Sequence, residues 1–291
     1  MSKDQWKNRI DNFIATLRRT IEVYTKHEMD VYSGYATFYF LMSAVPLLMM
    51  IISLINLLPW FSVEQMSTVL TTLIPDIPQL QRLILSVIIN LNRQSGQLTA
   101  YIFALTSLWS GSHGVNSMMV ALEKINHTQN DRIKERPKAI IYTVIFTFLI
   151  PSMLLFQMLR SWIMNAVTYI FTLLSLESVI AAIHEIIEVS GVITLAAMIL
   201  VVVMTYTFLP AGKRTVRSQL PGSILTCLFW ILFTNAFGFF IKRFWKMSSV
   251  YGALAAVFLA AMWLKFIVVI LFYGASLNRA LQVKVSRDCS T

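Results

Sequence analysis

Six long stretches free of acidic residues constrain this chain more than any other feature of its sequence. A helix that crosses the apolar core of a bilayer, about 30 Å thick, needs about 20 mostly apolar residues. The spans that we predict in these stretches cover residues 35–58, 98–122, 139–159, 189–209, 220–241 and 251–277. We therefore expect an all-α membrane protein with six transmembrane helices rather than a soluble globular domain.

Composition and charge agree with this expectation. The apolar set makes up 57% of the residues and charged residues 13%, against about 45–50% and about 25% in soluble domains. In so apolar a chain, the net charge of +10 indicates cytoplasmic loops rich in Lys and Arg, so we expect no nucleic-acid partner. Of the 24 Lys and Arg, 17 lie on one side of the predicted spans and six on the other. Both termini are thus predicted to be cytoplasmic.

Some segments outside the spans are also apolar. In residues 1–30, apolar side chains recur at steps of three and four, which predicts an amphipathic helix. It either lies on anionic headgroups or packs on the cytoplasmic loops.

Residues 63–91 hold two apolar stripes too short to cross the bilayer, which predict either a re-entrant pair or interfacial helices on the outer side. After residues 1–30, we predict a transmembrane domain over residues 31–279 and a cytoplasmic tail over residues 280–291.

The second predicted span, 98–122, is the most polar of the six. Its polar side chains near one helical face are Thr106, Ser110, His113, Asn116 and Ser117. Small residues and hydroxyls at such spacing suit close helix packing. They also suit a hydrated path for substrate or ions, in which the His113 imidazole could titrate near neutral pH. The sequence is compatible with both interpretations, helix packing and a hydrated path.

Lys265 lies near the middle of the last predicted span. A charge at the bilayer centre costs about 2.5–3.5 kcal/mol on insertion scales. Its ammonium group should therefore face the bundle interior, water or an anionic ligand, unless it snorkels to the interface. We add Lys265 to the candidate substrate or ion path.

A basic cluster joins the last two spans on the predicted outer side. It consists of Lys242, Arg243, Trp245 and Lys246. Three cations and an indole at an interface suit contact with lipid phosphates, or simply anchor a short loop.

The sequence shows no enzyme motif. Its four histidines and two cysteines have no metal-ligand spacing, and it has no Walker loop, dinucleotide fingerprint or Gly-x-Ser-x-Gly elbow. We expect no catalytic residue, no metal and no cofactor, and hence a protein that is not an enzyme.

Three blocks resemble a known family. They are Gly34-Tyr35-Ala36-Thr37-Phe38-Tyr39, Leu122-Glu123-Lys124-Ile125-Asn126 and Gly274-Ala275-Ser276-Leu277-Asn278. The chain resembles the YihY/BrkB family of bacterial membrane proteins, formerly labelled ribonuclease BN-like. The resemblance implies a six-helix protein of the bacterial plasma (inner) membrane with cytoplasmic ends. The family often has Glu in place of Ser276 and an aromatic residue in place of Lys265, so no role of a carboxylate at position 276 carries over.

Two functions remain as hypotheses. The first is a secondary transporter or permease-like protein for a small ion, anion or amphiphile, suggested by the polar face of residues 98–122 and by Lys265. The alternative is a non-transporting membrane protein that organises lipid or cell-envelope assembly. Ribonuclease activity is not expected. The expected partners are the lipid bilayer and an anionic lipid or small anionic ligand.

Overall fold

The computed structural model describes residues 3–56, 85–86, 89, 97–128, 137–145, 195–244 and 252–288. Every regular element within these ranges is helical, so the all-α prediction is confirmed for this part of the chain. The long helices are α1 (Lys3–Lys26), α2 (Met29–Asn56), α5 (Gln97–Asn126), α8 (Val216–Phe244) and α9 (Gly252–Asp288). Shorter helical segments cover residues 137–145 and Leu195–Phe208.

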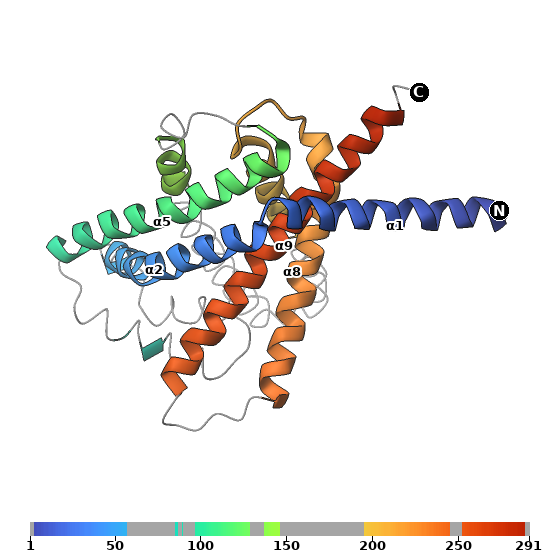
Figure 1. Ribbon diagram of the computed structural model, residues 1–291. Helices are drawn as coiled ribbons and strands as arrows, with labels where there is room; N and C mark the ends of the chain where they lie inside the picture. The colour runs from blue at the N-terminus through green and yellow to red at the C-terminus, as the bar shows by residue number, and fades with distance from the viewer. Residues whose placement is uncertain are drawn as a thin grey trace, which may run out of the picture.

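The long helices form two pairs. Figure 1 shows α2 and α5 running side by side in opposite directions, and α8 and α9 doing the same. The α1 helix crosses α9 near the place where the two pairs meet. The N-terminal and C-terminal helices therefore contact each other although they lie at opposite ends of the sequence.

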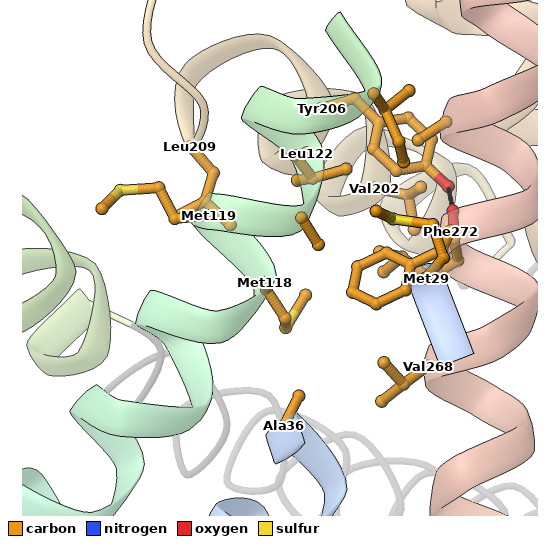
Figure 2. Packing of buried hydrophobic residues seen from close by; sticks show 14 of the residues in the cluster. Met29, Ala36, Met118, Met119, Leu122, Val202, Tyr206, Leu209, Val268 and Phe272 are labelled. Carbon is orange, nitrogen blue, oxygen red and sulfur yellow. Dashed lines mark hydrogen bonds between the residues drawn. The ribbon is translucent and has the colours of Figure 1, made fainter. Parts of the chain in front are cut away.

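The two pairs share a buried core. Figure 2 shows Met118 and Leu122 of α5 on one side of it and Val268 and Phe272 of α9 on the other. Met29 of α2 lies between them and is fully buried. The core thus sits where α2, α5 and α9 converge, and it holds one end of the bundle together.

In the part of the chain that the structure describes, two helices are long and apolar enough to cross a membrane. They are Val216–Ile241, with 26 residues, and Val257–Val283, with 27. At about 1.5 Å per residue each is about 40 Å long, more than the roughly 30 Å of a bilayer core. Large apolar side chains point outward from α8, among them Leu232, 64% exposed, and Phe239, 67% exposed. Such a surface suits contact with lipid.

The helices overlap the predicted spans to different extents. The spans predicted at 35–58 and 98–122 fall within α2 and α5, except for residues 57–58, which are not described. The α9 helix continues through Asp288, so most of the predicted tail extends the last helix. Residues 279–288 include no Gly or Pro that would end it. Almost all of 63–91 lies outside the described residues, and the six-span topology stays a prediction.

Candidate functional site

The predicted polar face lies on α5, and its residues differ in exposure. Ser110 and Ser117 are buried, His113 and Asn116 are partly buried, and Thr106 is exposed. The Thr106 hydroxyl donates to the Ile102 carbonyl of its own helix at 2.8 Å. The face is therefore continuous along α5 but turns from the bundle interior toward its surface.

Close packing against α2 accounts for part of this face. A Cβ at Gly114 would lie 2.7 Å from the Phe40 ring, which leaves no room for a larger residue. The Ser117 hydroxyl donates to the Tyr32 carbonyl of α2 at 3.0 Å. These contacts match the packing interpretation of small and hydroxyl-bearing residues.

His113 lies among aromatic rings. Its imidazole stacks on Tyr39 with ring centroids 4.9 Å apart, and Trp109 approaches it edge-on at 5.5 Å. Within the described residues no hydrogen bond reaches its ring nitrogens. The structure therefore places His113 at the α2–α5 contact, where ring packing fixes its orientation.

Lys265 lies on α9 with its side chain exposed. In the described ranges it makes no hydrogen bond or ion pair, and no such contact joins it to His113 or Ser110. Its neighbour Phe266 packs against Phe233 of α8, with centroids 4.9 Å apart. The structure thus does not bring Lys265 into one polar cluster with the α5 residues.

The predicted headgroup cluster is partly described. Arg243 is exposed in the last turn of α8, and the backbone of Lys242 belongs to the same helix. Trp245 and Lys246 lie outside the described residues, as does the side chain of Lys242. The proposed contact with lipid phosphates stays a prediction.

A charged cluster lies at the end of α5. Residues 209–215 between two helices are not helical. The Ala211 amide donates to Oε1 of buried Glu123 at 3.1 Å. The Arg214 guanidinium donates to the carbonyls of Pro210 and Ala211 at 3.0 and 2.9 Å, and to Oγ1 of Thr128 at 3.2 Å. We call Glu123, Thr128, Ala211 and Arg214 the latch.

Burial shapes the electrostatics of the latch. Burial lowers the pKa of the half-buried Arg214 guanidinium. The negative charge of Glu123 opposes this shift, and the positive charge of Arg279 adds to it. Arginine nevertheless stays charged at physiological pH. The latch therefore holds a charge that is withdrawn from water and kept in place by carbonyl groups, a hydroxyl and a nearby carboxylate.

A second polar contact ties three helical segments together in the core. The hydroxyl of Tyr206, in Leu195–Phe208, donates to the Leu271 carbonyl of α9 at 2.6 Å and lies 2.8 Å from Oγ1 of Thr226 in α8. Figure 2 draws the Tyr206 hydroxyl bond as a dashed line. All of these groups are buried. The contact fixes how Leu195–Phe208 packs on the α8–α9 pair.

The sequence interpretation missed Arg214 and Tyr206 as site residues. In the sequence, Glu123 directly follows a predicted span, and Arg214 is one of the 24 Lys and Arg residues. The bond between Ala211 and Glu123 spans 88 positions, which no periodicity can reveal. A signal was nevertheless present, because a Glu directly after an apolar span and a Pro-Ala-Gly break before a basic loop both require polar partners.

The described residues contain no group of three or more His, Cys, Asp or Glu side chains that could hold a metal ion. The described helices α8 and α9 are long and apolar enough to cross a membrane and carry outward-pointing apolar side chains, as the helices of α-helical membrane proteins do. Residues 20–289 match the model of the family described as virulence factor BrkB, and the chain belongs to that family.

Two relatives are similar over most of their length. The chain is 26% identical over 272 residues to the ribonuclease-like protein YfkH of Bacillus subtilis, covering 92% of this chain and 95% of that protein. It is 22% identical over 268 residues to the UPF0761 membrane protein of Actinobacillus pleuropneumoniae, covering 88% and 90%. No solved structure matches the chain.

Proposed function

We propose that this protein is a multi-pass protein of the bacterial plasma membrane, with both termini cytoplasmic, that acts as a secondary transporter or permease. Its cargo would be a small ion, an anion or an amphiphile. The latch is the observation that carries the proposal: Glu123 and Arg214 join the end of α5 to the non-helical segment 209–215. By the Lys and Arg count, this end of the bundle is cytoplasmic.

The latch has the properties of a gate. Segment 209–215 connects Leu195–Phe208 to α8. A movement of this segment away from the end of α5 has to break the bond from Ala211 to Glu123 and the bond from Arg214 to Thr128. Polar contacts of this kind can exchange partners with a charged ligand, whereas apolar packing cannot. Alternating access requires such an element with two arrangements. We place the path itself along the α5 face of Ser110 and His113. Lys265, which is exposed on α9 and lies apart from this face, is a separate candidate for contact with an anionic cargo.

Flux through liposomes tests this proposal. The purified protein is reconstituted and three probes are followed: protons with internal pyranine, chloride with internal lucigenin, and NBD-labelled phosphatidylglycerol with dithionite quenching. Wild type should move at least one probe faster than empty liposomes. Lys265→Met and Glu123→Gln should each slow that flux by about tenfold or more, the equivalent of removing one charged interaction.

Lys213→Met is the matched control. Lys213 is an exposed cation in the same segment as Arg214 and makes no hydrogen bond or ion pair within the described residues. Its flux should equal that of wild type. Folded wild-type protein that moves none of the three probes would contradict the proposal.

One observation favours the second candidate function, a membrane-organising protein. On α1, Ile14, Leu17 and Ile21 are 55%, 44% and 54% exposed, whereas Thr20 and Tyr24 are buried. An uncovered apolar stripe on a helix that also carries exposed Arg18 suits an anionic membrane surface. This candidate predicts that Leu17→Gln with Ile21→Gln reduces co-purifying phosphatidylglycerol and that wild type shows no flux.

A further inference from the structure

Two histidines that lie 100 positions apart in the sequence meet near the latch. His27 follows α1 and His127 follows α5. Their ring centroids are 5.0 Å apart, and one ring approaches the other edge-on. Neither residue belongs to the candidate path or to the latch.

The backbone fixes His127 in an uncommon conformation. Its φ is 55°, in the left-handed region where glycine is the usual residue. The Thr128 amide donates to the Glu123 carbonyl at 3.1 Å and the His127 amide to the Lys124 carbonyl at 3.2 Å. These are the two bonds of a Schellman motif, which ends α5. An imidazole therefore occupies a position that glycine would fill at a lower conformational free energy.

His27 is held by its own helix. Its Nδ1 lies 2.7 Å from the Val23 carbonyl, and because a carbonyl can only accept, Nδ1 is the donor. Nε2 is thus the nitrogen that remains for a ligand. The structure therefore orients the His27 ring before any ligand arrives, which reduces the entropy lost on binding.

Among the described residues, the charges that act on His127 are positive. Burial lowers the pKa of His127, and the positive charges of Arg279, His27 and Lys26 lower it further. The nearby carboxylates have other roles: Glu123 accepts from Ala211, and Asp30 accepts from the Tyr24 hydroxyl at 2.7 Å. Glu28 is exposed in the turn after His27. A metal cation would be repelled by Lys26 and Arg279, whereas an anion would be attracted.

We propose that Lys26, His27, His127 and Arg279 form a binding site for a phosphate group. The Lys26 ammonium and the Arg279 guanidinium offer charge-assisted donors to phosphate oxygens, and His27 and His127 add donors in their imidazolium forms, in which both ring nitrogens are protonated. The phosphate belongs either to an anionic lipid headgroup or to a small soluble molecule. The residues come from the ends of α1, α5 and α9, so binding joins three helices that are far apart in the sequence. The site does not depend on transport.

Binding measurements on the full-length protein in detergent test this site. The probes are inorganic phosphate and short-chain phosphatidylglycerol, with short-chain phosphatidylcholine as the zwitterionic control, and the readout is the Kd from titration calorimetry. Wild type should bind one or both of the first two probes and prefer phosphatidylglycerol to phosphatidylcholine. Binding of inorganic phosphate identifies a soluble ligand, and binding of phosphatidylglycerol alone identifies a headgroup.

The variants separate binding from folding. His127→Gly removes the imidazole and places glycine where the backbone favours it, so its Tm should equal or exceed that of wild type. Its Kd should rise about tenfold or more, as should that of Arg279→Gln. Glu28→Gly is the matched control, because Glu28 also has a φ of 55°, and it should bind as tightly as wild type or more tightly.

Three results would overturn the proposal. The first is that wild type binds neither probe. The second is that phosphatidylcholine binds as tightly as phosphatidylglycerol and inorganic phosphate does not bind. The third is that His127→Gly, or His127→Asn as a second residue that tolerates the left-handed region, keeps the wild-type Kd.

Discussion

The side-chain amide of Asn278 in α9 binds the peptide group of Gly222 in α8. Its Oδ1 accepts from the Gly222 amide at 2.7 Å, and its Nδ2 donates to the backbone and side-chain oxygens of Gln219, each at 3.1 Å. Pro221, which precedes Gly222, lies inside α8 and has no amide hydrogen. The Asn278 side chain thus supplies hydrogen bonds at a place where a proline interrupts the helix ladder.

Gly222→Ala should destabilise the protein. A Cβ at Gly222 would overlap the Gly274 carbonyl oxygen and the Asn278 side chain, and one of the two colliding groups is backbone. Overpacking of this kind costs about 1–3 kcal/mol. Thermal unfolding in detergent, followed by tryptophan fluorescence, should therefore show a lower Tm than wild type.

Gly34→Ala is the control for this variant. In the described structure a Cβ at Gly34 meets nothing within 4 Å. Because alanine favours a helix over glycine by about 0.5–1 kcal/mol, its Tm should equal or exceed that of wild type. Equal melting temperatures for the Gly222 and Gly34 variants would contradict the packing that we describe for α8 and α9.

Tyr206→Phe should lower stability by about 1–3 kcal/mol. The change removes a buried hydroxyl and leaves the Leu271 carbonyl without its donor. The Tyr142 hydroxyl donates to the Phe208 carbonyl at an exposed position. Because water can replace this hydroxyl, Tyr142→Phe should lower the free energy of unfolding by less than Tyr206→Phe does. Urea unfolding in detergent measures both. The assignment fails if the two variants lose the same stability.

The fold could be predicted further than the site. The gaps between charges predict α2, α5, α8 and α9, because burying an unpaired charge in lipid is costly whatever the tertiary contacts are. The latch joins Glu123 to Ala211, and His27 meets His127 only after folding, so neither contact has a local signature. His27 and His127 follow different helices, so their spacing in the sequence does not predict their contact.

The predicted topology can be tested by cysteine labelling in intact cells. In a Cys289→Ser background, Lys213→Cys should resist a membrane-impermeant maleimide until the cells are opened, because the Lys and Arg count places it in the cytoplasm. Arg243→Cys should react in intact cells. Both parent side chains are exposed, so burial does not explain a difference. Labelling of both positions from outside would contradict the proposed orientation.

The stability of the protein should decrease as pH falls below about 6.5, and His127 should contribute to this decrease. Burial and the charges of Arg279, His27 and Lys26 lower its pKa in the folded state, so the unfolded chain binds the proton at a higher pH. The contribution of His127 to stability is therefore fully present above the pKa that this residue has in the unfolded chain. It is lost as pH falls through the lower pKa that His127 has in the folded protein. Arg214, Glu28 and Glu123 lie near the same helix ends.

Tm measured from pH 7.5 to pH 5 in phosphate-free buffer tests this dependence. His127→Gln should have a shallower slope than wild type, and Lys213→Met, which removes a cation outside the group, should keep the wild-type slope. If phosphate binds beside His127, its negative charge raises the pKa of the imidazole, so saturating phosphate should flatten the wild-type slope and leave His127→Gln unchanged. A wild-type slope in His127→Gln would show that other groups cause the acid destabilisation.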